Sequence, residues 1–181
     1  SPFWQTIFEE LRANSYADLE GAEAAAVLPV SDRLVTRIIR ERLPADAPIR
    51  DVDLRADGDE QITVRFRVTR PAFFPPFTVR LRIEQQPTLP HTPVLRLRLL
   101  SHGLVALAAP AARLLGALPP GVSLNGDRLN LHIDRLLVSA GVGDVLPHLS
   151  LLELHVLPTR LVFTVRGGVP GPTAPGAPAQ P

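Results

Sequence analysis

The chain has 181 residues, and its 19 basic and 18 acidic residues give a formal net charge of +1. It contains no Cys, which excludes disulfides, thiolate metal sites and Cys nucleophiles. Every basic residue is Arg, and the low net charge argues against the broad positive surface of a duplex-binding protein, so we expect no nucleic-acid partner.

The N-terminal part predicts two helices separated by an extended segment. Apolar residues recur at helical spacing over residues 3–11 and indicate a short amphipathic helix. Residues 19–28 are rich in Ala, which favours a helix, but they contain Gly21 and precede Pro29, and we interpret them as a strand. Ser31 is a predicted N-cap of a second helix, which Pro44 ends.

Four segments with alternating apolar and polar residues follow this helix. They cover residues 49–54, 62–68, 77–83 and 95–99. Alternation of this kind is typical of strands with one buried face, so we expect an antiparallel meander.

The second half predicts further short elements. Residues 104–118 are apolar almost throughout but contain Pro110, which favours a kinked helix against the sheet. The turn Asn125-Gly126-Asp127 predicts a hairpin, and Asp134 is a predicted cap of a short helix. Two last strands are expected at 152–156 and 161–165.

These elements define an α+β fold with an antiparallel sheet of about eight strands and several short helices. We expect a single domain over residues 1–166. Residues 167–181 consist mainly of Gly, Pro and Ala and predict a disordered tail.

Arginines occupy the polar phase of three successive predicted strands. A meander would place them on one face, where guanidinium groups could bind phosphate or lipid head groups. The alternative is a solvated face whose Arg stems cover the sheet. The candidate head-group or anion residues are Arg65, Arg67, Arg80, Arg82, Arg96 and Arg98.

Most of the aromatic residues fall in two clusters. Amphipathic helices with Trp and Phe are typical of membrane-interface anchors, and an exposed Phe-Phe loop would mark an interaction site. Ordinary core packing is the alternative. The candidate membrane-interface residues are Phe3, Trp4, Phe8, Phe73 and Phe74.

Catalytic and metal-binding signatures are missing from the sequence. The five His residues show no HExxH or close ligand spacing, and there is no GxSxG elbow or GxxxxGK[ST] loop. We therefore expect no enzyme activity, no catalytic residues, no metal and no cofactor.

Two stretches carry a resemblance to a known family. LEGAEAAAVLPVSDRLVTRII joins a short segment to a capped amphipathic helix, and LPPGVSLNGDRLNLHI forms a late element. With the alternating strands between them, they resemble the LmeA-like bacterial phospholipid-binding family, which has the architecture of the tubular lipid-binding (TULIP-like) proteins. The resemblance covers about residues 19–165, and residues 104–118 depart from it.

The resemblance implies a long amphipathic helix and short helices packed on the apolar face of a curved sheet, with a lipid-sized groove between them. It implies a non-catalytic lipid-binding or lipid-transfer domain, with a phospholipid or another acyl-chain ligand as partner and possible contact with an anionic membrane surface. The predicted groove residues are Leu34, Val35, Ile38, Ile39, Val64, Phe66, Val79, Leu81, Leu97 and Leu99.

A structural or protein-interaction domain with a closed core is the alternative, and the sequence leaves the oligomeric state open. We favour the bacterial cell envelope or a peripheral membrane location, with the cytoplasm as an alternative. Because the sequence starts at Ser1, a preceding signal peptide and a preceding anchor both stay open.

Overall fold

A computed structural model describes residues 2–69, 75–100 and 120–170, without the side chains of residues 2–4 and 8. The predicted helix at 104–118 and most of the predicted tail lie outside the described residues. The same holds for Phe73 and Phe74 and for the side chains of Phe3, Trp4 and Phe8.

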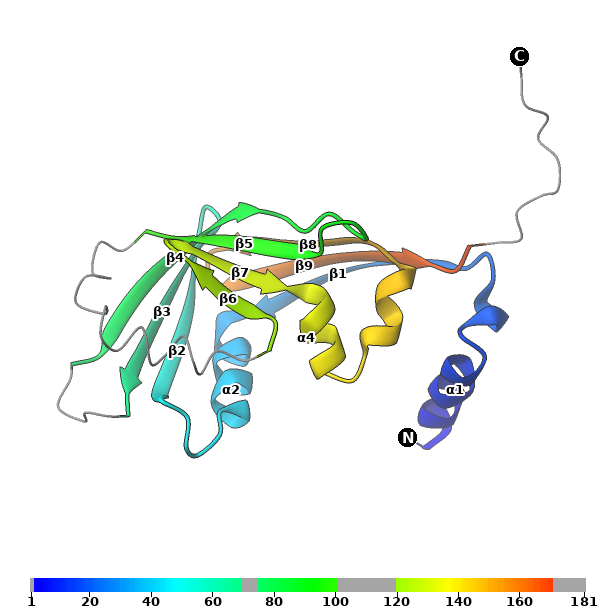
Figure 1. Ribbon diagram of the computed structural model, residues 1–181, viewed down its shortest axis with the longest axis horizontal. Coiled ribbons are helices and arrows are strands. Elements are labelled where there is room, and N and C mark those ends of the chain that lie inside the picture. Colours follow the sequence, from blue (N-terminus) through cyan, green and yellow to red (C-terminus); the bar gives the residue numbers. More distant parts are fainter. Residues whose placement is uncertain (1, 70–74, 101–119, 171–181) are drawn as a thin grey trace, which may run out of the picture.

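The described chain has the predicted α+β class, with antiparallel sheets (Figure 1). Both the predicted hairpin and the two last strands are confirmed. The elements are α1 (Pro2–Ala13), η1 (Ala17–Leu19), β1 (Glu23–Ser31), α2 (Asp32–Arg42), β2 (Ile49–Gly58), β3 (Gln61–Val68), β4 (Phe77–Gln85), β5 (Val94–Leu99), β6 (Val122–Asn125), β7 (Arg128–His132), α4 (Ile133–Ser139), η3 (Gly143–His148), β8 (Leu149–Leu157) and β9 (Arg160–Gly168).

The strands form two sheets, so the expectation of one sheet is wrong. One sheet has six strands in the order β2-β3-β4-β5-β7-β6, and the other has three in the order β1-β9-β8. The three-stranded sheet extends beyond the six-stranded one toward α1 (Figure 1). The sequence pattern missed this division because alternation identifies a strand but not its partners, and β9 pairs along its length with both β1 and β8.

Helix α2 begins as predicted, with the Ser31 Oγ accepting a hydrogen bond from the Leu34 N–H at 3.2 Å. However, α2 has only 11 residues and lies along the edge of β2, so the prediction of a long helix over the apolar face is wrong. The Thr36 Oγ1 donates to the Leu54 carbonyl at 3.1 Å and accepts from the Leu54 N–H at 2.9 Å. Two further pairs extend this contact, the Asp32 carboxylate with the Ala56 N–H and the Arg40 Nε with the Val52 carbonyl.

This side-chain ladder follows from two matching repeats. Four helical residues rise about 6 Å and two strand residues about 6.6 Å, so every fourth residue of α2 meets every second residue of β2. The exposed backbone groups of an edge strand are thereby satisfied without another strand. In effect, α2 occupies the position of an additional strand.

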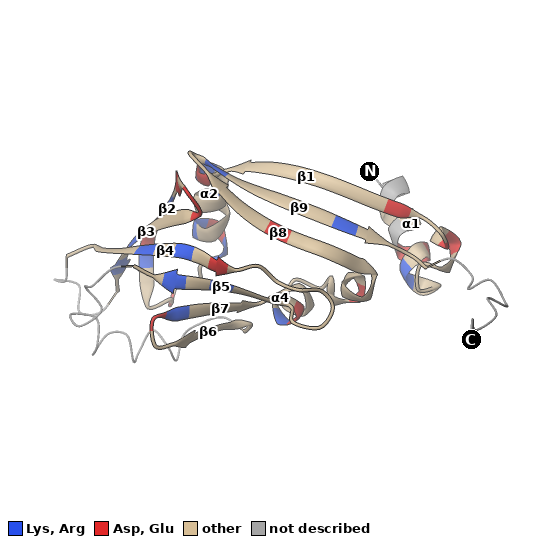
Figure 2. Ribbon diagram, turned by 90° about the horizontal axis from the view of Figure 1, so that it is seen from above, with Lys and Arg blue, Asp and Glu red and all other residues tan. Residues whose placement is uncertain are grey.

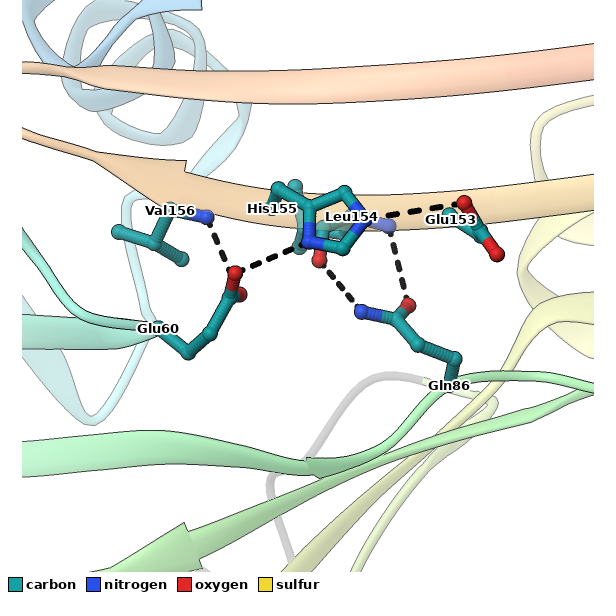
Figure 3. Close-up of polar contacts among 6 residues, drawn as sticks. All are labelled: Glu60, Gln86, Glu153, Leu154, His155 and Val156. Carbon is teal, nitrogen blue, oxygen red and sulfur yellow. Dashed lines mark hydrogen bonds and ion pairs between the residues drawn. The ribbon is translucent and has the colours of Figure 1, made fainter.

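The outer edge of β8 has no neighbouring strand in its own sheet, and side chains next to strands of the six-stranded sheet bind it in a similar way (Figure 3). The Gln86 side chain donates to the Leu154 carbonyl at 2.6 Å and accepts from the Leu154 N–H at 3.0 Å. The Glu60 carboxylate accepts from the Val156 N–H at 3.2 Å. Glu60 lies in the turn between β2 and β3 and Gln86 directly follows β4, so side chains at strand ends of the six-stranded sheet join it to the edge of β8.

The hydrophobic core lies at this junction. Its buried cluster combines Ala56 and Ile62 of the six-stranded sheet with Val156 and Leu161 of the three-stranded sheet. Val156 is 1% exposed and Leu161 is 3% exposed. The apolar faces of the two sheets therefore meet in one core.

Two shorter segments differ in detail from the sequence predictions. Helix α4 starts at Ile133 with His132 at the N-cap position, so Asp134 lies in the first turn and is not the cap. Strand β9 runs through Gly168, two residues beyond the predicted domain boundary. The glycines of this strand end pair with Ala24 and Glu23 of β1, a contact that composition alone does not predict.

Helix α1 is tied to η3 by polar contacts with Asp144. The Tyr16 hydroxyl donates to the Asp144 carboxylate at 2.7 Å, and the Arg12 Nε lies 3.0 Å from the same oxygen. The Tyr16 hydrogen bond and the Arg12 charge lower the pKa of Asp144. These contacts attach the N-terminal helix to the outer end of the three-stranded sheet.

Candidate functional site

One face of the six-stranded sheet is apolar. Cross-strand partners such as Val64 and Val79, or Leu81 and Leu99, place their side chains on this face, where the rings of Phe66 and Phe77 have centroids 5.8 Å apart. The structure thus brings together the six strand residues of the predicted groove, namely Val64, Phe66, Val79, Leu81, Leu97 and Leu99.

The four predicted groove residues on α2 lie elsewhere. Because α2 runs along the strand edge, Leu34, Val35, Ile38 and Ile39 stand beside the apolar face instead of over it. Val35 packs against the core cluster, whereas Ile38 is 47% exposed. Described residues line four open clefts, and of the ten predicted groove residues only Phe66 lines one of these four.

The three-stranded sheet carries a second apolar surface that sequence reasoning did not single out. On one of its faces, every cross-strand row consists of apolar side chains. We call this surface the apolar strip. Its rows are Val30, Leu161 and Val156, then Leu28, Phe163 and Leu154, then Ala26, Val165 and Leu152.

Exposure along the apolar strip is lowest in the row at the core and higher in the next two rows. The first row contains the buried Val156 and Leu161. Phe163 and Leu154 in the second row are half-buried, while Leu28 is 52% exposed. The strip is therefore core at one end and accessible surface at the other.

The apolar strip was hard to find because β1 is apolar on both faces. The run from Ala24 to Val30 contains no polar residue, so it gives no period-2 signal. The alternation that exists lies in β8 and β9, which sequence reasoning did identify as strands. Only the register with β9 decides which residues of β1 join the strip.

The opposite face of the six-stranded sheet carries the predicted arginines. We call it the Arg face; its blue positions lie across β3, β4, β5 and β7 in Figure 2. Arg82 lies opposite Arg98, which lies opposite Arg128. By register the Arg face comprises Arg50, Arg55, Arg65, Arg67, Arg80, Arg82, Arg96, Arg98 and Arg128.

Carboxylates and an amide neutralise or bind part of the Arg face. The Arg98 Nε lies 3.1 Å from the Asp127 carboxylate, and the Arg67 Nε lies 3.8 Å from that of Asp51. The Arg96 Nε donates to the Asn130 Oδ1 at 3.2 Å. The Glu84 carboxylate, 2.9 Å from the Arg128 Nε, raises the pKa of that guanidinium.

Two polar clusters were not predicted from the sequence. The His155 Nδ1 lies 2.9 Å from the Glu60 carboxylate and its Nε2 lies 3.6 Å from that of Glu153, and these contacts raise the pKa of His155. The Ser123 Oγ lies 3.2 Å from the His132 Nε2. The Glu60–His155 and Ser123–His132 contacts join residues 95 and 9 positions apart, which local sequence patterns do not link.

Within residues 2–69, 75–100 and 120–170, no group of three or more His, Asp or Glu residues could hold a metal ion. In the same ranges, no helix has both the length and the hydropathy needed to cross a bilayer.

No family model matches the chain, and neither the curated proteins nor the solved structures include a match.

Proposed function

We propose that this protein is a non-catalytic lipid-binding or lipid-transfer domain that holds acyl chains against the apolar strip. The observation that carries the proposal is the change in exposure along the strip, from Val156 at 1% to Leu28 at 52%, on a face with no polar side chain. An apolar surface that continues a core into solvent is a typical place for an apolar ligand.

The dimensions of the strip support an acyl chain as the ligand. Ala24 continues this face of β1 beyond Ala26, and from Val30 to Ala24 the strand rises through six residue steps, or about 20 Å. One leaflet contributes about 15 Å to the hydrocarbon core of a bilayer, so a single acyl chain can lie along the strip. Each methylene that leaves water contributes about 0.8 kcal/mol, which makes apolar contact alone sufficient for binding.

The proposal changes the site that the sequence predicts but keeps its chemistry. The ligand would lie on the three-stranded sheet, with Phe163, Val165 and Leu152 beneath it, and not between α2 and the six-stranded sheet. Membership of the LmeA-like family stays a prediction, and a phospholipid ligand agrees with it. On the Arg face, Arg65 and Arg82 have no ion pair among the described residues and would be available to anionic head groups.

A pair of adjacent substitutions tests this proposal. Leu28→Asp places a charge on the apolar strip, whereas Val27→Asp places it on the opposite face of the same strand at a side chain that is 64% exposed. We expect Leu28→Asp to lower the affinity for a fluorescent fatty acid at least tenfold and Val27→Asp to leave it unchanged. Equal affinities of the two variants would contradict the proposed site.

Mass spectrometry of an organic extract of the purified wild-type protein provides a second measurement. We expect a co-purifying lipid at a substantial molar ratio. If the extract contains no lipid and the fatty-acid probe does not bind the wild-type protein, the lipid-binding proposal is wrong.

A protein-interaction domain is the second candidate, and it depends on the outer edge of β1. The Asp32 N–H bonds to Thr159 and the Ala22 carbonyl to Val169, so even-numbered residues of β1 face β9 and odd-numbered residues face outward. Glu23, Ala25 and Val27 thus offer backbone groups to a partner strand. Under this candidate, Val27→Asp as well as Leu28→Asp should reduce the assemblies that light scattering detects.

A further inference from the structure

An open cleft of about 960 Å³ lies between α2, β2 and the turn that joins β8 to β9. Arginines from α2, from β2 and from the start of β9, directly after this turn, line the cleft. Arg33, Arg37 and Arg40 come from α2, Arg55 comes from β2, and Arg160 comes from the start of β9.

The cleft has an excess of positive charge. Its five arginines face three carboxylates, those of Asp32, Glu41 and Asp53, which leaves a surplus of two. Two of these carboxylates already have partners, since Asp32 accepts from the Ala56 N–H at 3.2 Å and Asp53 lies 3.7 Å from Arg40.

Four guanidinium groups in the cleft have no partner in the described part of the chain. No hydrogen bond or ion pair among the described residues involves the side chains of Arg33, Arg37, Arg55 or Arg160. Like charges gathered in one concave site repel each other, and an anion bound between them relieves this repulsion.

The three elements that carry these arginines are joined through the backbone. The Thr159 N–H donates to the Ala56 carbonyl at 2.9 Å, and the Asp32 N–H donates to the Thr159 carbonyl at 3.1 Å. Asp32, Thr36 and Arg40 fix one side of α2 to β2, so Arg33 and Arg37, one turn apart on the adjacent side, keep their direction over the cleft. The positive end of α2 also lies here.

We propose that this cleft binds a phosphate-bearing ligand through Arg33, Arg37, Arg55 and Arg160. Guanidinium groups bind phosphate oxygens in pairs, and several from different elements can surround one phosphate group. A volume of about 960 Å³ leaves room for an organic group attached to the phosphate. Either a soluble phosphate ester or the head group of a phospholipid has this chemistry.

This inference does not depend on the proposed acyl-chain site. Arg55 belongs to the Arg face, and Arg160 lies on the face of β9 opposite to the apolar strip. The phosphate site and the strip are therefore on different sides of the sheets, and each can be tested without the other.

The test compares two double variants of the full chain. Arg33→Gln with Arg37→Gln removes two guanidinium groups from the cleft. Arg42→Gln with Arg135→Gln removes two exposed arginines that line none of the four described clefts and is the matched control. Both changes lower the net charge equally, so a nonspecific electrostatic effect would appear in both.

Two probes separate the possible sources of the phosphate. Titration calorimetry with glycerol 3-phosphate measures binding of a soluble ester, and cosedimentation with vesicles of phosphatidylglycerol in phosphatidylcholine measures binding of a head group. We expect the wild-type protein and the control to bind at least one probe, and the cleft variant to bind it at least tenfold more weakly. Binding of glycerol 3-phosphate assigns the site to soluble esters, whereas binding of vesicles alone assigns it to lipid head groups.

The proposal is overturned if the cleft variant and the control bind the probes equally, or if the wild-type protein binds neither. Circular dichroism of both variants checks that each is folded. All four exchanged positions are exposed, so we expect both to keep the wild-type spectrum.

Discussion

The two ends of the apolar strip are built from the same kinds of residues but differ in what surrounds them. At the inner end, Val156 and Leu161 pack against Ala56 and Ile62, and side chains of the six-stranded sheet satisfy the edge of β8. Toward the outer end, Leu28 in the second row is 52% exposed and Ala26 in the third row is also exposed. The inner end therefore contributes to stability, whereas the outer end leaves apolar side chains accessible to solvent.

Truncation of one leucine at each end should give the largest difference. Leu161→Ala removes a side chain that is 3% exposed, and we expect it to lower the free energy of unfolding by about 2–5 kcal/mol. Leu28→Ala should cost about 1 kcal/mol or less, because half of that side chain is already in water. Denaturant titration measures both, and similar losses would show that the outer end is also part of the core.

The ladder between α2 and β2 should give the next largest effect. Thr36→Val keeps the shape of the side chain but removes both hydrogen bonds to Leu54, and Thr36 is 6% exposed. We expect a loss of about 1–3 kcal/mol, since the Leu54 N–H and carbonyl would lose their partner.

Thr78→Val is the matched control for Thr36→Val. Thr78 lies exposed on the Arg face, where its substitution should change the free energy of unfolding by no more than about 0.5 kcal/mol. If both substitutions have the same small effect, solvent or a shifted α2 satisfies the edge of β2 and the ladder is unimportant.

The edge of β8 offers a smaller version of the same experiment. Gln86→Leu removes the two hydrogen bonds to the Leu154 backbone, and we expect a loss of about 1 kcal/mol. Amide hydrogen exchange at Leu154 should accelerate, while the exposed Gln85→Leu leaves it unchanged. Unchanged exchange in Gln86→Leu would mean that the two sheets are held together by the core alone.

Local sequence patterns predict the strands of this fold well and its sheet partners poorly. The alternation around Val64 and Arg65 was enough to define β3 and to separate an apolar face from an Arg face. It gave no information on where β1 pairs, because β1 is apolar from Ala24 to Val30. A strand without alternation can join any sheet, and its register is decided by long-range contacts.

The side chains that hydrogen-bond to the sheet edges could not be identified from the sequence, for a different reason. Asp32, Thr36 and Arg40 form a polar stripe, which in sequence is the pattern of a solvated helix face. Glu60 and Gln86 likewise lie just outside strands, where polar residues are typical of turns. Polar residues that bind backbone across 12 or more positions can be recognised only when the partner strand is known.

Protonation of His155 should produce the smallest effect. His155 lies next to Val156 on β8, on the face opposite to the strip. Hydrogen bonding to Glu60, with Glu153 nearby, raises the pKa of His155 above its ordinary value of about 6.5. The imidazolium therefore stabilises the fold fully below pH 6.5, and this contribution is lost as the pH rises through the raised pKa. Because the side chain is 47% exposed, we expect a change well below about 1 kcal/mol.

Denaturant titrations at pH 6 and pH 8.5 measure this contribution. The free energy of unfolding of the wild-type protein should fall more between these values than that of His155→Gln. His91→Gln, at an exposed position without an ion pair among the described residues, should behave like the wild type. An identical pH dependence in all three proteins would mean that the Glu60 contact is made equally well by the neutral ring, and that the junction owes its stability to packing and backbone hydrogen bonds.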